Sequence, residues 1–207
     1  RPLLPSLTDA RGGDAPRVLE VASGTGVHAA HVAAHAGGDG GYCVGAWYPT
    51  DCDAEARRAC DERFAAADSS PVRPSAHLEL REGDLESETE WERGQPKLAA
   101  AGVDLILTVN MVHISPWGAT LGLFGLAGRV LARSGALVIY GPFKEKGTAV
   151  PSNLSFDEAL RRRDPEWGVR DLEAVSELAR KCGLTLDQKV EMPANNLGLV
   201  FRRCHQV

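Results

Sequence analysis

The stretch Val18–Gly26, VLEVASGTG, decides the fold of this 207-residue chain. Its first four residues read as a buried β-strand that carries one acidic residue, Glu20. Gly24 and Gly26 then form a tight Gly-x-Gly turn, and residues 28–36 have helical spacing. Glycine lets the backbone approach a ligand closely, and a helix N-terminus directs unpaired N–H groups at that ligand. The stretch therefore predicts a cofactor-binding strand–turn–helix unit.

The rest of the chain repeats this alternation of strand and helix. Further strands are predicted over residues 42–47, 77–80, 103–109, 136–140, 184–191 and 197–202, and helices over 53–64, 120–131, 155–163 and 171–182. The 155–163 helix is expected to open with a capping box, Ser155 to Glu158. Residues 86–101 fit either a loose helix or a surface insertion. The alternation predicts a mostly parallel, doubly wound α/β sheet, and the closing strand pair predicts one antiparallel strand.

Length and composition suit a single domain over residues 1–207. The chain starts at Arg1 without Met, so we expect an N-terminal arm that is incomplete here. A net charge of −5 argues against bulk binding of nucleic acid, and no apolar run reaches the length of a membrane span. The five scattered cysteines contain no Cys-x-x-Cys pair, which favours reduced thiols and a cytoplasmic location.

Acidic residues are predicted at the ends of three successive strands. Glu20 precedes the first glycine by four residues, where a carboxylate would repel a pyrophosphate and attract the ammonium and sulfonium of S-adenosylmethionine. Asp51 is placed to accept both ribose hydroxyls, as it would also be in an NAD site. Asp84 and Leu85 can bracket an adenine amino group. Each acid alone could be a helix cap or a turn residue, but together they favour a cofactor site.

Several stretches resemble class I S-adenosylmethionine-dependent methyltransferases, and among them an uncharacterised "methyltransferase-like" family. They are VLEVASGTGVHAAHVA, WYPTD, VNMVHISPW, LVIYGPF, SNLSFDEALRRRDPEWGVRDLEAV and VEMPANNLGLVFRR, and they extend from Val18 to Arg203. The resemblance implies a Rossmann-like sheet of seven strands with the last antiparallel. It also implies S-adenosylmethionine as the cofactor. The residues expected to contact it are Glu20, Ala22, Gly24, Gly26, His28, Asp51, Asp84, Leu85, Asn110 and Met111.

Candidate catalytic and substrate residues follow the fourth and fifth predicted strands. His113 is the best general-base candidate because its unperturbed pKa is near 6.5, although it could equally be a structural residue. Tyr140 could hydrogen-bond the acceptor, or could be a buried strand residue. The residues expected to contact the acceptor are Trp117, Asn153 and Asn195. Core packing is the alternative for Trp117, and turn chemistry is the alternative for Asn195.

Two weaker patterns were considered. His28, His31 and His35 fall on one helical face, but no cysteine or carboxylate joins them at ligand spacing, so we expect no metal. Arg170 and Asp171 are interpreted as a helix cap with an ion pair.

We therefore expect a methyltransferase acting on a small-molecule acceptor. The alternatives are an NAD(P)-dependent oxidoreductase and a non-catalytic protein that keeps the cofactor fold.

Overall fold

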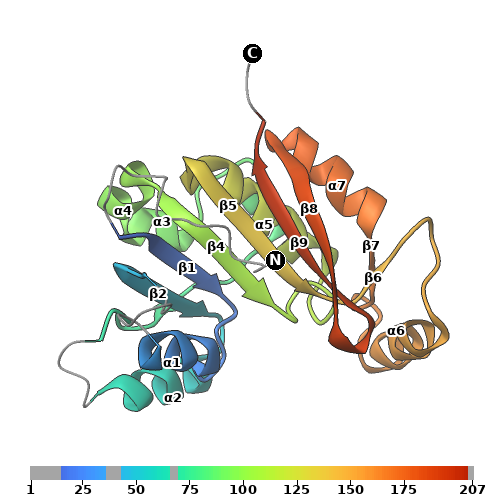
Figure 1. Ribbon diagram of the computed structural model, residues 1–207, viewed down its shortest axis with the longest axis horizontal. Helices are drawn as coiled ribbons and strands as arrows, with labels where there is room; N and C mark the ends of the chain where they lie inside the picture. Colours follow the sequence, from blue (N-terminus) through green and yellow to red (C-terminus); the bar gives the residue numbers. More distant parts are fainter. Residues whose placement is uncertain (1–14, 36–42, 66–69, 205–207) are drawn as a thin grey trace.

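A seven-stranded sheet forms the centre of the protein, whose computed structural model describes residues 15–35, 43–65 and 70–204. The strand order is β3-β2-β1-β4-β5-β9-β8. All neighbouring strands pair in parallel except β9, which is antiparallel to both β5 and β8 (Figure 1). The strands are β1 (Arg17–Val21), β2 (Ala46–Asp51), β3 (Ala76–His77), β4 (Val103–Val109), β5 (Leu131–Gly141), β8 (Leu184–Met192) and β9 (Asn196–Arg203). This arrangement confirms the predicted fold class.

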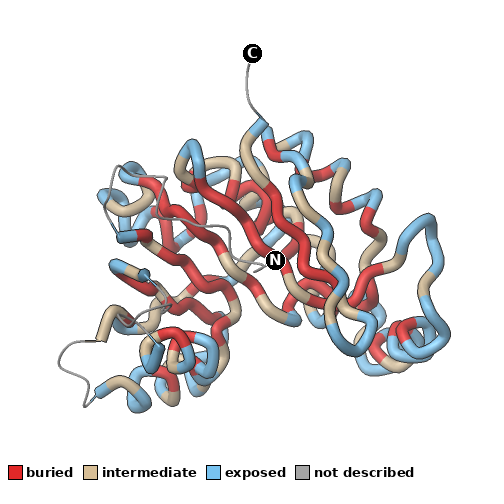
Figure 2. Tube along the Cα trace, viewed as in Figure 1, coloured by how far each residue is buried: buried red, intermediate tan, exposed pale blue. Residues whose placement is uncertain are grey.

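Helices cover both faces of the sheet. The larger apolar core lies between the sheet and α5 and α7, and a smaller one lies under α1. The central strands are buried along most of their length (Figure 2). The helices are α1 (Val27–Ala34), α2 (Ala54–Phe64), α3 (Glu90–Gly94), α4 (Pro96–Ala101), α5 (Trp117–Val130), α6 (Pro151–Arg163) and α7 (Leu172–Lys181), with 3-10 turns η2 (Glu82–Leu85) and η3 (Pro193–Asn195). A small separate sheet pairs β6 (Phe143–Lys144) with β7 (Arg170–Asp171).

The second strand differs from the prediction of residues 42–47. β2 spans Ala46–Asp51, and Tyr42 lies outside the described residues. Pro49 lies inside this strand, although proline lacks the N–H that a strand residue usually donates. The Trp47 N–H donates to Pro71 O at 2.9 Å, and Pro49, two residues further, directs its nitrogen to the same side. On that side of β2, the neighbouring strand β3 begins only at Ala76, which pairs with Thr50. The sheet therefore tolerates the missing N–H of Pro49.

Two other boundaries also differ. β3 contains only Ala76–His77, so the chain leaves the sheet well before Asp84. The predicted capping box at Ser155 is wrong, since α6 already begins at Pro151 after an extended Val150. Proline is favoured at the first helical position, where its missing N–H costs nothing. The ambiguous residues 86–101 form the short helices α3 and α4.

The glycines of α5 bring another segment unusually close to the helix. A Cβ on Gly122 would lie 2.6 Å from Arg81 O, and one on Gly125 would lie 2.3 Å from Asp84 O. η2 therefore packs directly on the helix backbone. The helix tolerates these poor helix formers because the contact they allow replaces the stability they cost.

Candidate active site

The carboxyl ends of β1 to β4 border one cavity of about 440 Å³. In an open parallel sheet, ligands bind at this edge, where neighbouring crossovers leave to opposite faces. The lining residues are Val21, Ala22, Cys52, Leu78, Glu79, Leu80, Arg81, Met111, Ile114, Ser115, Pro116, Gly118, Ala119 and Trp167. We call this space the strand-end cavity. Of the residues expected at the cofactor, it contains Ala22 and Met111.

The backbone is strained where β1 and β4 end beside one another. Ala22 and Asn110 both have φ of 57°, in the left-handed region that non-glycine residues rarely adopt. Each such residue costs of order 1–3 kcal/mol and persists only where surrounding structure enforces it. The strain therefore marks the point at which the two adjacent strand ends turn away from the sheet.

The glycine turn is tied to the end of β2. Gly24 N donates to Asp51 Oδ2 at 2.9 Å, while Asp51 Oδ1 accepts from Asp53 N at 2.9 Å. Among the described residues, and apart from its own chain neighbours, nothing lies within 4 Å of a Cβ built on Gly24, whereas a Cβ on Gly26 would meet Cys60 Sγ at 2.7 Å. The two glycines thus have different tasks: Gly24 leaves open space at the turn, and Gly26 allows α2 to pack against it.

Both carboxylate oxygens of Glu20 contact protein groups. The residue is 1% exposed, and its two carboxylate oxygens accept from Trp47 Nε1 at 2.7 Å and contact His28 Nδ1 at 2.9 Å. A buried carboxylate needs such partners, and these come from β2 and α1. The Glu20–His28 contact raises the pKa of His28, because a hydrogen-bonded carboxylate favours the imidazolium. Glu20 therefore braces the glycine turn from behind.

Asp84 and Leu85 are also displaced from their expected place. They lie in η2 against α5, where Asp84 Oδ2 accepts from Arg81 N at 2.7 Å. The cavity wall after β3 is instead built from Leu78, Glu79, Leu80 and Arg81. The cause is the early end of β3 at His77. Residues 78–81 therefore lie at the sheet edge, and Gly83-Asp84-Leu85 lies further along the chain in η2.

A second cavity, of about 360 Å³, adjoins the first at Ile114. We call it the His113 cavity. No charged side chain lines it, apart from any charge on His113 itself. Its lining residues are Asn110, His113, Ile114, Pro142, Asn153, Phe156, Ala194 and Asn196.

His113 is held neutral in this cavity. It is 4% exposed, and its Nδ1 has no hydrogen-bond partner among the described residues. Burial and the nearby positive charge of Arg170 lower its pKa to about 4. The Phe156 ring stands edge-on to the imidazole with 5.6 Å between centroids. The imidazole is therefore unprotonated at neutral pH, the state from which a general base acts, and its low pKa makes it a weaker base than a free histidine.

Arg170 positions the loop that carries His113. Its guanidinium donates to Val112 O at 2.9 Å and to Ser115 O, and Gly168 N donates to His113 O at 3.0 Å. The predicted ion pair of Arg170 is absent from the part of the chain that the structure describes, although Asp171 does cap α7. Sequence reasoning missed this role because contacts to backbone carbonyls leave no pattern in the side chains.

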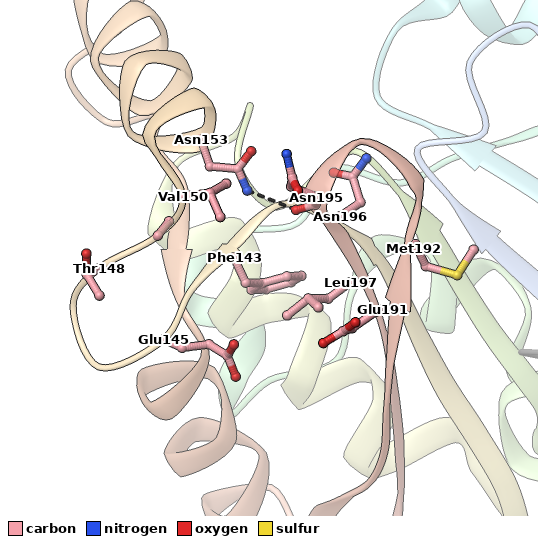
Figure 3. Close-up of a pocket in the computed structure, with 11 residues that line it drawn as sticks. Phe143, Glu145, Thr148, Val150, Asn153, Glu191, Met192, Asn195, Asn196 and Leu197 are labelled. Carbon is pink, nitrogen blue, oxygen red and sulfur yellow. Dashed lines mark hydrogen bonds between the residues drawn. The ribbon is translucent and has the colours of Figure 1, made fainter.

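A third cavity, of about 270 Å³, lies beyond Asn153 and Asn196, which line both it and the His113 cavity (Figure 3). Asn153 Nδ2 donates to Asn195 O at 2.9 Å, which joins α6 to the turn between β8 and β9. Asn196 Nδ2 donates to the Tyr140 hydroxyl at 3.1 Å. The structure thus brings Asn153 and Asn195 together and connects Tyr140 to the same turn.

Trp117 does not lie at the His113 cavity. It begins α5 and lines a separate cavity, where the guanidinium carbon of Arg170 lies 5.7 Å from its ring centroid. Of the histidines on α1, His35 Nδ1 contacts His31 O while His28 faces Glu20. Within the described residues, no three His, Cys, Asp or Glu side chains are grouped to hold a metal ion. None of the described helices is long and apolar enough to cross a membrane.

The chain belongs to the family described as "Protein of unknown function (DUF938)", whose model matches residues 2–203.

Solved structures share its fold at low sequence identity. An O-methyltransferase family protein from Burkholderia thailandensis matches with a TM-score of 0.70 at 15% identity, covering 99% of this chain and 55% of the other. The mitomycin 7-O-methyltransferase MmcR matches with a TM-score of 0.66 at 14% identity, covering 92% and 49%. LepI, solved in complex with SAM, matches at 0.65 and 14% identity, covering 96% and 47%. The chain spans about half the length of these proteins, and the likeness establishes the fold.

Proposed function

We propose that this protein is an S-adenosylmethionine-dependent methyltransferase acting on a small-molecule acceptor. The observation that carries the proposal is the strand-end cavity, which the ends of β1 to β4 border beside the glycine turn. LepI, which has a similar fold, was solved in complex with SAM. Two other proteins of similar fold are described as O-methyltransferases. Fold alone does not define a function, so the argument depends on the residues around the cavity.

The residues present fit this cofactor. Gly24 leaves open space at the turn, and the neighbouring Ser23 Oγ is buried with no partner among the described residues. Such a buried unsatisfied hydroxyl calls for a ligand or water. Asp51 keeps acceptor capacity beyond its two backbone bonds, as expected for a group that receives ribose hydroxyls. Ala22, Met111 and the Leu78–Leu80 wall would enclose the adenosine part.

Bound S-adenosylmethionine supplies a methyl group made electrophilic by the adjacent sulfonium. The chain's own contribution is to position the acceptor in the His113 cavity and to take its proton. His113 is neutral and buried beside Asn110, Asn153 and Asn196, whose amides can orient a hydroxyl or amine. Ile114 lines both cavities, so the cofactor and the acceptor would approach one another beside it.

Calorimetric titration with S-adenosylmethionine, S-adenosylhomocysteine and NADPH in parallel tests the cofactor. Saturable binding of the first two alone supports the proposal. Binding of NADPH alone overturns it in favour of an oxidoreductase, a class that retains weight because Glu20 faces away from the site. Binding of the two sulfur compounds without turnover on any acceptor would favour a non-catalytic protein.

The role of His113 is tested separately. We expect His113→Ala to keep the affinity for S-adenosylhomocysteine within about twofold and to lose about 10²–10⁴-fold in turnover on an acceptor found by screening, the usual worth of a general base. Unchanged turnover would remove His113 from the mechanism. Tyr140→Phe is the companion variant, since it deletes only the hydroxyl that meets Asn196.

A further inference from the structure

A fourth cavity, of about 370 Å³, shares no lining residue with the three already described. It lies between the start of α5, the β6–β7 pair and α6. We call it the cationic cavity, because three of its eight lining residues are basic and one is acidic. The lining residues are Trp117, Lys144, Gly147, Arg161, Val169, Arg170, Asp171 and Ala174.

The charges around this cavity are not balanced. Asp157, buried behind it, accepts from Lys144 Nζ at 2.5 Å, from Arg161 Nε at 3.3 Å and from Val169 N at 2.7 Å. One carboxylate therefore serves two cations. Asp171 is occupied with the backbone N–H groups of Gly147 and Glu173, at 2.8 and 3.1 Å.

Arg170 has no carboxylate partner in the described part of the chain. Its hydrogen bonds go to the backbone carbonyls of Val112, Ser115 and Glu166. These bonds use Nε and Nη2, so within the described residues Nη1 is left to meet a ligand, and carbonyls do not neutralise the guanidinium charge. Burial and the positive charge of Arg161 lower its pKa from the usual value, while the negative charge of Asp157 acts in the opposite direction.

The backbone accommodates this placement of the two arginines. A Cβ on Gly168, whose φ is +152°, would lie 2.7 Å from Arg161 Nη2 and 2.7 Å from Asp157 Oδ1. Glycine at this position thus lets Arg161 lie across the chain toward the cavity. The Trp117 ring faces Arg170 and closes another wall.

We propose that the cationic cavity binds a small oxyanion, a phosphate or a carboxylate, between Arg161 and Arg170. Two guanidiniums converging on a cavity with one uncompensated charge suit an anion, because guanidinium donates paired N–H groups to phosphate and carboxylate oxygens. The anion comes either as the free ion or as one group of a larger metabolite. Because the cavity is separate from the other three, this ligand is distinct from the cofactor and acceptor and goes beyond the proposed function.

The position of Arg170 makes such a ligand relevant to the loop above it. The same guanidinium that would meet the anion holds the carbonyls on either side of His113. An anion that binds Arg170 therefore contacts the side chain that holds the loop of His113 in place.

The test is a titration of the protein with inorganic phosphate, acetate and phenyl phosphate, followed by calorimetry and by Trp117 fluorescence. It is run at low ionic strength against matched additions of chloride, because salt screens exposed charge. We expect saturable binding of the oxyanions beyond the chloride baseline. Tighter binding of phenyl phosphate than of phosphate identifies a metabolite group as the ligand, and equal binding identifies the free ion. Trp117→Phe separates the signal of Trp117 from those of the other tryptophans.

Adjacent arginines of α6 provide the matched variants. Arg161 and Arg162 each pair with the acidic residue four positions earlier, Asp157 and Glu158, but only Arg161 lines the cavity. Arg161→Gln should weaken oxyanion binding about tenfold, Arg161→Lys should recover part of it, and Arg162→Gln should change it less than twofold. The proposal is overturned by an absence of binding beyond chloride, or by equal losses in both glutamine variants. Titration of each variant with S-adenosylhomocysteine is a separate measurement. It checks that the variant is folded and tests the proposed cofactor independently of the oxyanion.

Discussion

Glu20 and His28 form a pair across the glycine turn, with Oε1 and Nδ1 2.9 Å apart. The contact ties the end of β1 to the first turn of α1, while the second oxygen of Glu20 binds Trp47 on β2. Three elements around the glycine turn are thus joined through one buried carboxylate. The fold exploits a strand-end acid for internal bracing, with the ligand side of the turn left to Gly24 and Asp51.

This pair makes stability depend on pH. The folded protein raises the pKa of His28, so the pair stabilises it fully below the unfolded pKa near 6.5 and loses that contribution as pH rises through the raised value. We expect the wild type to exceed His28→Gln in free energy of unfolding by more at pH 6 than at pH 8, measured with urea. His35→Gln is the control, because the His35 ring contacts the backbone carbonyl and the ring of His31 in place of a carboxylate. A pH-independent difference would contradict the prediction.

His113 acts in the opposite direction. Its pKa is about 4 in the folded protein and near 6.5 in the unfolded chain. Between pH 6.5 and 4, His113 is therefore protonated in the unfolded chain and neutral in the folded protein. As the pH falls from 6.5 to 4, this difference should lower the free energy of unfolding by up to about 3 kcal/mol, at about 1.36 kcal/mol per pKa unit. His113→Asn should show a flatter pH dependence in urea unfolding. An unaltered slope in the variant would mean that His113 titrates normally.

Asp51 should govern cofactor affinity. Asp51→Ala removes the acceptor of Gly24 N and Asp53 N together with the proposed ribose contact. We expect the affinity for S-adenosylhomocysteine to fall at least about tenfold, since losing a charged hydrogen-bond partner costs about 1.5–3 kcal/mol. Glu55→Ala, in the first turn of α2, is the control and should bind normally. Equal affinity in Asp51→Ala and the wild type would refute the ribose assignment.

The contact between α5 and η2 predicts unequal effects of two glycine substitutions. Gly125→Ala places a Cβ 2.3 Å from Asp84 O and 2.6 Å from Leu85 Cα. Overpacking of this kind typically costs about 1–3 kcal/mol in the free energy of unfolding. A Cβ on Gly83, in η2 itself, meets nothing within 4 Å, so Gly83→Ala should stay within about 0.5 kcal/mol of the wild type. Urea unfolding of the two variants checks this, and similar losses would rule out the close packing.

A residue lies where the sequence predicts when its place in the fold depends on its neighbours along the chain. The glycine turn, Ala22 and Met111 occupy strand ends and therefore reach the same sheet edge. The prediction and the structure differ where the contacts of a side chain come from a residue far away in the sequence. Glu20 is claimed by Trp47 and His28, and Trp117 faces Arg170 in another cavity.

The sequence by itself determined the order of strands and helices, the parallel sheet with one antiparallel strand, and the place of the glycine turn. Apolar periodicity and turn residues are local signals, and they act through backbone preferences that each segment carries with it. Only the tertiary structure decided that β3 ends early and moves Asp84 onto α5, that Arg170 holds the loop of His113, and that Arg161 and Arg170 meet in one cavity. These outcomes depend on packing and charge between residues far apart in the chain, which no local pattern records.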